Sequence, residues 1–206
     1  MGLLLDIHVH TQRHSMCSHI DEHLLIQRAV RAGLDGIVLT EHHYQWSNEE
    51  LDALRRESGV PGFILLAGFE CTTEKGDILI YGLESGQTAL FAPGGDPERT
   101  LQHAQALGAL CIAAHPTRSL MGFDERIARM PFDGIEVKSV NLKPHEQQLA
   151  AKLATSVGLR PVAASDAHRI EAVGAYSMEF DGLIQSMADL QHAIRSGQFR
   201  IPGKQS

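Results

Sequence analysis

The sequence predicts an α/β fold in which about seven strands close into a barrel, for three reasons. Short apolar segments alternate with amphipathic helical patterns along the chain. These segments are almost continuously hydrophobic, which is typical of parallel strands that are buried on both faces. Histidine, aspartate and glutamate follow several of them, and a barrel gathers the C-terminal ends of its strands into one cluster. We therefore expect a closed barrel in one domain, residues 1–206, rather than an open sheet.

The individual elements follow from the hydrophobic patterns and from the residues that begin or end helices. Strands are predicted at residues 3–9, 36–40, 63–68, 78–81, 110–114, 134–137 and 161–164. Helices are predicted at residues 22–32, 48–58, 97–107, 144–157 and 187–196. Ser47 precedes two glutamates in the manner of an N-cap, and Gly33, Gly108 and Gly158 follow predicted helix ends, where glycine is favoured.

One pattern occurs three times: a helix end, a glycine, a short apolar strand and then a residue type that binds metals. It occupies residues 32–42, 107–115 and 157–168. The three copies end in His42, His115 and His168. Because parallel strands end at the same edge of a barrel, we expect these imidazoles to lie close together.

Composition and charge restrict the partners. The formal net charge is −7 with a pI near 5.9, and no Lys/Arg-rich run occurs, which argues against nonspecific binding to duplex nucleic acid. The three cysteines are widely spaced, and the N-terminus lacks the features of a signal peptide. No apolar run approaches membrane-spanning length. We therefore expect a cytoplasmic protein that has no membrane partner.

The segment Asp6-Ile7-His8-Val9-His10-Thr11 is the most informative part of the chain. Side chains two residues apart on a strand point to the same face, so His8 and His10 project together. Two adjacent imidazoles on a rigid strand form half of a transition-metal site and indicate a metal-dependent hydrolase. Further candidate ligands stand at other strand ends: His42, Glu70, His115, Asp166 and His168.

Six motifs occur in order along the chain. They are Asp-x-His-x-His-Thr (6–11), Thr-Glu-His (40–42), Gly-x-Glu (68–70), Ala-His-Pro (114–116), Gly-Ile-Glu-Val (134–137) and Ser-Asp-Ala-His (165–168). This series resembles the PHP (polymerase and histidinol phosphatase) family of metal-dependent phosphoesterases, over nearly the whole chain. The resemblance implies a distorted, TIM-like (β/α)7 barrel that holds two or three divalent metal ions, usually Mn²⁺, Zn²⁺ or Fe.

Carried over position by position, the resemblance implies three metal sites. The first would be held by His8, His10, Glu70 and Asp166. Glu70 would bridge to a second metal that His115 also holds, and a third metal would lie between His42 and His168.

The chain departs from the family pattern in two places. Relatives complete the third site with an Asp or His five or six residues after the second histidine, where Ser15 and Met16 stand here. The replacements to consider are His14, Cys17 and His19. The second site often has another histidine near the fourth strand, where either Asp77 or Glu84 is a candidate.

Arg118 and Arg169 each follow a ligand motif directly. Because arginine can hold a phosphate group with two parallel hydrogen bonds, we expect both to contact the substrate. Lys138 and Asn141 are weaker candidates for the same role. Asp6 is expected to orient a histidine ligand through a hydrogen bond.

The predicted reaction is hydrolysis of a small phosphate monoester, in which a hydroxide between closely spaced metals attacks phosphorus in line. One alternative is a 3′-exonuclease or phosphodiesterase on single-stranded nucleic acid, although the sequence lacks an evident basic groove with stacking aromatics. A second is an amidohydrolase, which typically carries a bridging carboxylated lysine where Glu70 stands. A third is a metal-binding regulatory module without turnover. The sequence predicts neither the leaving group nor the oligomeric state.

Overall fold

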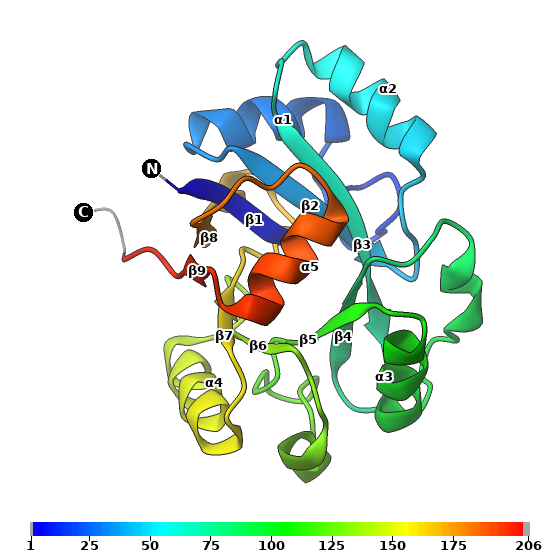
Figure 1. The fold of residues 1–206 in the computed structure, drawn as a ribbon, viewed down its shortest axis with the longest axis vertical. Helices are drawn as coiled ribbons and strands as arrows, with labels where there is room; N and C mark the ends of the chain where they lie inside the picture. The colour runs from blue at the N-terminus through cyan, green and yellow to red at the C-terminus, as the bar shows by residue number, and fades with distance from the viewer. Residues whose placement is uncertain (1, 204–206) are drawn as a thin grey trace.

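A curled sheet organises the computed structural model, which describes residues 2–203 (Figure 1). Nine strands of this part of the chain form the sheet in the order β7-β6-β5-β4-β3-β2-β1-β8-β9. Their bounds are β1 Leu3–Val9, β2 Gly36–His42, β3 Ile64–Thr72, β4 Asp77–Tyr81, β5 Leu110–Ala114, β6 Gly134–Lys138, β7 Pro161–Ala163, β8 Met178–Phe180 and β9 Phe199–Arg200. Strands β1 to β7 are thus neighbours in chain order within a curled, half-barrel sheet, and no ladder in the described part of the chain pairs β7 with β1.

Helices cover the outside of the curled sheet and one of its ends (Figure 1). Their bounds are α1 Glu22–Arg31, α2 Asn48–Ser58, α3 Pro97–Ala106, α4 Pro144–Val157 and α5 Met187–Ser196, with 3-10 turns η1 Gln87–Leu90, η2 Glu125–Arg129 and η3 Ile170–Ala172. Helix α5 differs from the others because it packs on the interior of the barrel. Its Leu190 and Ile194 belong to the same core cluster as Leu5 of β1 and Ile112 of β5.

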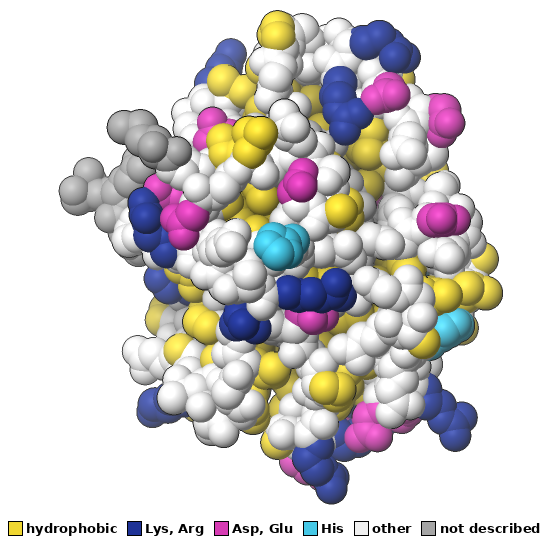
Figure 2. Space-filling view, viewed as in Figure 1, with side chains coloured by type: hydrophobic (Ala, Val, Ile, Leu, Met, Phe, Trp, Pro, Cys, Tyr) yellow, Lys and Arg dark blue, Asp and Glu magenta, His cyan; other side chains and the backbone are white. Residues whose placement is uncertain are grey.

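The face that carries α5 shows acidic and basic side chains scattered among apolar ones, without a large patch of either sign (Figure 2). Among residues 2–203, no helix combines the length and the apolar character that are needed to span a bilayer.

The parallel pairing expected throughout the sheet is wrong at β4, which runs antiparallel to both β3 and β5. The reason is the length of the connection. Only residues 73–76 separate β3 from β4, and a parallel crossover needs about a dozen residues or more. Instead, Thr73 N donates to the carbonyl of Gly76 (3.1 Å), and the positive φ of Gly76 (84°) closes a tight turn. This departs from seven regular β/α units.

Strands β8 and β9 were not predicted from the sequence. Both pair antiparallel, β8 with β1 and β9 with β8. They contain three and two residues, so their hydrophobic patterns are too short to be recognised.

The seam between β1 and β7 is closed by the chain that follows β7. Asp166 N donates to the carbonyl of His8 (2.8 Å), and His10 N donates to the carbonyl of Ala167 (3.1 Å). A parallel bridge between Val9 and Ala167 lies at the same level. The seam therefore brings the last predicted ligand motif directly beside the first.

Asp6 belongs to this seam. Its carboxylate accepts hydrogen bonds from the backbone N–H groups of Ser165 (2.9 Å) and Gly174 (3.1 Å). Asp6 also accepts a long hydrogen bond from the backbone N–H of His8 (3.5 Å), but no hydrogen bond to a histidine ring is found within residues 2–203, so it contacts this predicted ligand through the backbone and not through the ring. Its role is to join β1 to the segments after β7.

Strand β1 contains an irregularity that controls where His8 points. The register with β2 shifts between Asp6 and Val9, because three steps along β1 correspond to two along β2. Such a bulge re-aims the side chains around it. As a result Ile7 packs in the interior core, and its neighbour His8 is also fully buried, against His10.

The packing of α5 against the barrel interior predicts a large effect of truncation. Leu190→Ala should lower the free energy of unfolding by about 2–5 kcal/mol, because Leu190 is fully buried and the substitution leaves a cavity. Urea unfolding would measure the change. Leu183→Ala is the matched control: this leucine is 68% exposed, and we expect a change below about 0.5 kcal/mol. Equal effects of the two substitutions would contradict the closing role of α5.

Candidate metal centre

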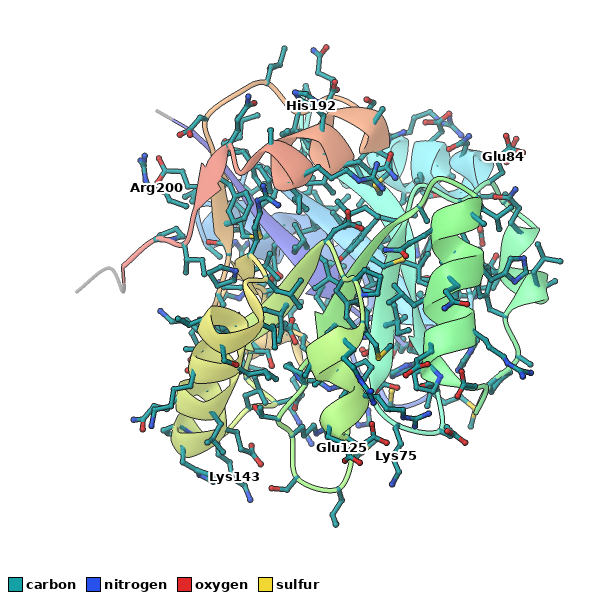
Figure 3. All side chains as sticks on the ribbon, turned by 60° about the horizontal axis from the view of Figure 1, so that its bottom comes forward. Lys75, Glu84, Glu125, Lys143, His192 and Arg200 are labelled. Atoms are coloured by element: carbon teal, nitrogen blue, oxygen red, sulfur yellow. The ribbon has the colours of Figure 1, made fainter. Side chains whose placement is uncertain are left out.

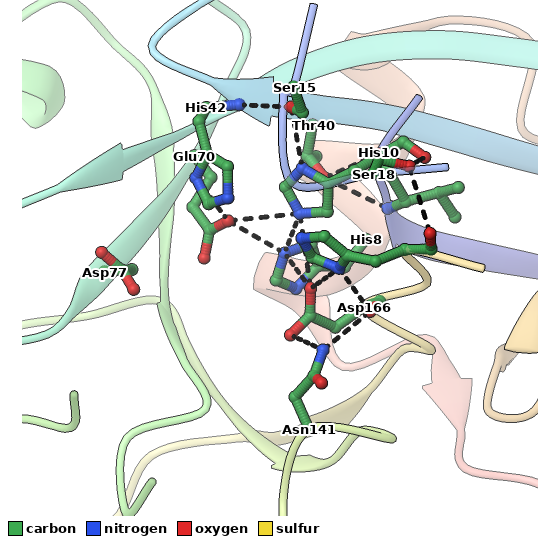
Figure 4. A network of polar contacts seen from close by, with 12 residues as sticks. His8, His10, Ser15, Ser18, Thr40, His42, Glu70, Asp77, Asn141 and Asp166 are labelled. Carbon is green, nitrogen blue, oxygen red and sulfur yellow. Dashed lines mark hydrogen bonds and ion pairs between the residues drawn. The ribbon is translucent and has the colours of Figure 1, made fainter. Parts of the chain in front are cut away.

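The seven predicted ligands come together at the C-terminal end of the barrel. Figure 4 labels five of them: His8, His10, His42, Glu70 and Asp166. Four separate parts of the chain supply them: β1, the β2–β3 pair, the loop after β5 and the loop after β7. Together with Asp77 they form three groups whose ligand atoms lie within 4.8 Å of one another. The first group is His8, His10, Glu70 and Asp166, the second is Glu70, Asp77 and His115, and the third is His10, His42 and His168.

The first group has the spacing of ligands around one cation. The Nε2 atoms of His8 and His10 are 3.0 Å apart. Glu70 Oε2 lies 3.4 and 3.2 Å from these nitrogens, and Asp166 Oδ1 lies 3.3 Å from each. Nitrogen ligands about 2.1 Å from a metal are separated by distances of about this size. All four side chains are 99–100% buried.

The hydrogen bonding of the first group also fits a metal. Oδ1 of Asp166 is buried and has no hydrogen-bond partner among residues 2–203. A buried carboxylate oxygen without a donor is costly unless a cation compensates it. The other oxygen, Oδ2, accepts a hydrogen bond from Asn141 (2.8 Å), which leaves Oδ1 facing the two imidazoles. The donor set, two imidazoles and two carboxylates, suits Zn²⁺, Mn²⁺ or Fe.

Glu70 connects the first group to the second. Its Oε2 faces the first group, while its Oε1 lies 3.0 Å from Nε2 of His115. Asp77 Oδ2 lies 3.6 Å from the same nitrogen. Glu70 can therefore bridge two cations, in the way the family resemblance implies.

The reversal of β4 decides between the two carboxylates considered for the second group. Asp77 begins β4, so the antiparallel strand starts beside the ends of β3 and β5. Glu84 follows the other end of β4 and is exposed. Figure 3 shows Lys75, just before β4, and Glu84 far apart on the molecule. Glu84 is therefore ruled out as a ligand, and Asp77 is the carboxylate that faces His115.

The third group contains imidazoles alone. The ring centroid of His10 is 4.6 Å from that of His42 and 4.3 Å from that of His168. Ser15, at a position where relatives carry a ligand, is occupied elsewhere: its hydroxyl donates to Glu41 (2.6 Å) and accepts from His42 N (3.1 Å). Met16 is fully exposed. Neither Ser15 nor Met16 supplies the missing ligand.

The histidine ligands are held from behind by two buried glutamates that the sequence did not single out for this role. Glu136 Oε1 lies 3.1 Å from Nδ1 of His8, and its Oε2 accepts from the backbone N–H of His115 (2.8 Å). Glu41 contacts His10 through Ser15, whose Oγ is 3.3 Å from Nδ1 of His10. Glu136 thus takes the orienting role expected of Asp6. Glu41 could have been recognised from the sequence by its position inside the Thr-Glu-His motif.

The backbone is strained at two of the ligands. His115 and Asp166 have positive φ angles of 27° and 52°. This region is costly for residues other than glycine, although aspartate tolerates it better than most. Such strain persists where the surroundings fix a side chain for function. Both residues directly follow the strand or seam that delivers them to the cluster.

Charge and burial shift the pKa values of the cluster in opposite directions. Burial alone would lower the pKa of His8, but the charges of Asp166 and Glu70 raise it well above its usual range. Burial likewise opposes the charged form of Glu70, yet His8 and its other imidazole neighbours lower its pKa strongly. The pKa of His115 rises to about 9 because Glu70 outweighs burial, and burial together with Glu70 raises the pKa of Asp77 to about 6.

A cavity of about 280 Å³ lies over the cluster. Arg118 lines it, as expected of a substrate contact. Arg169 is exposed and is absent from the lining of this cavity in the described chain, so its contact with substrate stays a prediction. Asn141 also lines the cavity, but its amide donates to Asp166 and positions that ligand. Lys138 ends β6 outside the lining.

Comparisons with known proteins agree with this arrangement. Residues 144–199 match the model of a family described as PHP-associated. PsfC from Pseudomonas syringae has a similar structure, with a TM-score of 0.72, 20% sequence identity and coverage of 100% of this chain and 93% of that chain. No curated protein matches the sequence.

Two further structures share the fold. One, from Bifidobacterium adolescentis and assigned as a metal-dependent phosphoesterase, has a TM-score of 0.61 at 16% identity and covers 80% of this chain and 87% of its own. The other, the lesion-specific endonuclease PfuEndoQ from Pyrococcus furiosus, has a TM-score of 0.64 at 13% identity; the match covers 98% of this chain and 58% of the endonuclease. These structures share the fold of this chain, and the family model matches the part of it that contains α4, β7 and α5.

The contacts of Glu136 predict its effect on metal binding. Glu136→Ala should weaken metal affinity by about 10–100-fold, because His8 loses the group that orients its ring. Glu136→Gln keeps an oxygen that can accept a hydrogen bond from His8, so it should weaken metal affinity less than Glu136→Ala does. Competition with a chromophoric chelator would measure the affinities. Glu84→Ala, on the opposite end of β4, is the control and should bind as the parent does. An alanine variant at 136 with parental affinity would exclude the orienting role.

The pKa shifts predict opposite pH responses with and without metal. In the metal-free protein, the pKa of His115 (about 9) lies above its ordinary value of 6.5, so the stability it contributes is present at low pH and lost as pH rises through about 9. Metal binding requires deprotonated ligands, so the loaded protein should instead lose stability on acidification. Melting temperatures in EDTA and in Mn²⁺, from about pH 5 to about pH 10, would test this. If the melting temperatures in EDTA and in Mn²⁺ changed with pH in the same direction, this prediction would be wrong.

Proposed function

We propose that the protein is a metal-dependent phosphoesterase that hydrolyses small phosphate monoesters. The observation that carries the proposal is one buried carboxylate, Glu70, shared by two ligand groups beneath a cavity that Arg118 lines. Divalent cations held by these groups would supply Lewis-acid chemistry, because they acidify bound water and offset charge on phosphoryl oxygens. The protein's own task is to hold the ligands, bind phosphate and exclude bulk water.

Each described residue contributes to one of these tasks. Asp166 and Glu70 provide the negative charge that a pair of divalent cations requires. Arg118 can bind a phosphate group with two hydrogen bonds and so fix its orientation above the cluster. Glu136 and Asn141 hold His8 and Asp166 in place. Preorganised charge of this kind is usually the largest contribution to catalysis.

The dimensions of the site favour a small substrate. A cavity of about 280 Å³ is slightly below the usual range for small-molecule pockets, about 300–1,000 Å³. The net charge of −7 also disfavours a long nucleic acid, whose binding depends on many Lys/Arg contacts to phosphates. A compact phosphorylated metabolite, in a cytoplasmic setting, fits these properties best.

The experiment described below also distinguishes two other functions. A phosphodiesterase or nuclease would use the same ligands on a substrate with two ester bonds, and the endonuclease from Pyrococcus furiosus shares the fold. A regulatory module would bind metal without turnover. An amidohydrolase is less favoured, since Glu70 bridges the first two groups where such enzymes typically carry a carboxylated lysine.

The test compares p-nitrophenyl phosphate with its bis-ester in the presence of Mn²⁺, together with the metal content of the protein. We expect monoester turnover that EDTA abolishes. Arg118→Ala should raise KM about tenfold or more without changing metal content, because a charged hydrogen bond to phosphate is lost. Arg169→Ala tests the second arginine in the same assay.

Arg31→Ala, an exposed change in the last turn of α1, is the control and should leave KM unchanged. Preference for the bis-ester would favour the nuclease, and bound metal without turnover on either ester would favour the regulatory module. Absence of bound metal after reconstitution would refute the proposal.

A further inference from the structure

We infer that the thiolate of Cys17 is the ligand that completes the third group, together with His42 and His168. The inference rests on the metal dependence proposed above and extends it to a third cation held by sulfur. Nothing in the family pattern supplies this ligand, because the two positions that normally do so are Ser15 and Met16 here.

Charge is the first argument. The first and second groups each contain two carboxylates, with Glu70 in both. The third group has three imidazoles and no anion of its own. Its nearest carboxylates are Glu70, with Oε2 3.2 Å from Nδ1 of His42, and Asp166, with Oδ1 3.5 Å from Nδ1 of His168, and both already belong to the first group. A divalent cation between neutral imidazoles gains from a negatively charged ligand, which is why thiolate or carboxylate accompanies histidine in most such sites.

The backbone around Cys17 is fixed beside this group. Ser18 N donates to the carbonyl of Ser15 (2.9 Å), so residues 15–18 form a turn. Ser18 Oγ donates to the carbonyl of His10 (2.9 Å), and the N–H of His19 donates to the carbonyl of His168 (2.9 Å). The turn is thus tied to two of the three histidines, on either side of Cys17.

The side chain of Cys17 faces the same cavity as the histidines. Cys17, His42 and His168 all line the 280 Å³ cavity over the cluster. The thiol is exposed and lies outside the three groups of ligand atoms that are within 4.8 Å of one another, so binding to a cation there requires it to rotate about its own Cα–Cβ bond toward the two rings. The other two cysteines, Cys71 and Cys111, are buried.

Two atoms at this cavity lack hydrogen-bond partners, which is a separate indication of a cation. Nδ1 of His42 and Oδ1 of Asp166 are buried and make no hydrogen bond within residues 2–203. Nδ1 of His42 instead faces Glu70 Oε2 at 3.2 Å, and Oδ1 of Asp166 faces the Nε2 atoms of His8 and His10 at 3.3 Å, as ligands that share cations would. Both residues line the cavity with Cys17. Water cannot reach these two atoms freely, so a cation is the natural group to satisfy them.

Other loop residues are directed elsewhere. The ring of His14 stacks on Tyr44 at 3.8 Å between centroids, and its Nε2 lies 3.1 Å from a carboxylate oxygen of Glu50. Met16 is fully exposed, and His19 is exposed and absent from the cavity lining in the described chain. Of the replacements considered from the sequence, Cys17 alone lines the cavity.

Glu41 is a further carboxylate near the third group, and its hydrogen bonds keep it from a cation there. Its carboxylate accepts from the N–H and the hydroxyl of Thr11, from Ser15 Oγ and from Trp46 Nε1. Its nearer oxygen is 4.0 Å from Nδ1 of His10, behind the ring. Both oxygens are therefore already satisfied.

A thiolate changes which metal the third group prefers. Sulfur is a soft ligand that selects Zn²⁺ or Fe²⁺ over Mn²⁺, whereas the carboxylate-rich first and second groups accept all three. The identity and the release of the cation in the third group should therefore depend on whether the exposed thiol of Cys17 is free to bind it as a thiolate.

The direct test is protection of Cys17 from alkylation. The full-length protein is treated with iodoacetamide after loading with Zn²⁺ or with EDTA, and the modified residues are counted by mass spectrometry. We expect Zn²⁺ to slow alkylation of Cys17 at least about tenfold, because the coordinated sulfur is no longer a free nucleophile. Cys71 and Cys111, which are buried, serve as internal references. An unchanged rate at Cys17 would overturn the inference.

Metal content gives an independent measurement. Cys17→Ser should lower the Zn²⁺ content from three per chain to two, whereas Cys17→Asp, which restores an anionic ligand, should keep the third. Met16→Ser changes the neighbouring exposed residue and should retain three. With Co²⁺ in place of Zn²⁺, the thiolate-to-cobalt charge-transfer absorption should be present in the parent and absent from Cys17→Ser.

The outcomes separate the two proposals. Two bound metals, turnover of the monoester and an unprotected Cys17 would refute the sulfur ligand and leave the phosphoesterase intact. Three metals in Cys17→Ser would do the same. A protein that binds no metal under any condition would refute both.

Discussion

The carboxylate of Glu70 is the group on which the site depends. It is 99% buried and lies within 3.4 Å of four imidazoles, those of His8, His10, His42 and His115. A buried negative charge is stable only when positive charge surrounds it on several sides. Protons on the imidazoles can provide that charge, and so can metal cations, which makes the cluster a site where the two compete. The path of the chain at this end of the barrel brings all of these side chains to the one carboxylate.

Two features of the chain path meet this need. The seam after β7 hydrogen bonds to β1, which carries Asp166 to within 3.3 Å of both histidines of the first motif. The reversal of β4 brings the first residue of that strand, Asp77, to the same end as the last residues of its neighbours. A regular parallel unit would have directed that position to the opposite end of the barrel, as happens to Glu84. The distortion therefore adds a carboxylate to the cluster, and β3 is joined to β4 by a short turn in place of a crossover helix.

The sequence carried enough information to predict the barrel ends and the ligand cluster, because both depend on local patterns that repeat. The strand-end histidines and Glu70 are examples: each follows an apolar run, and topology then gathers them. The reversal of β4 was accessible only through the length of its turn, residues 73–76. The sequence could not predict that Glu136, and not Asp6, contacts the ring of His8. This contact depends on a bulge in β1 and joins residues that are 128 positions apart in the chain. Spatial neighbours of this kind leave no periodic signal.

The loop after β1 shows how one small side chain can redirect a site. The hydroxyl of Ser15 is short and polar, so it reaches inward to Glu41 and to the backbone of His42 instead of outward to a cation. This anchoring pulls residue 15 beneath the imidazoles and starts the turn that ends at Ser18. With a serine there, the next residue that can face the cavity is Cys17, two positions along the same turn. The inward hydrogen bonds of Ser15 and the position of Cys17 at the cavity are therefore features of one and the same turn.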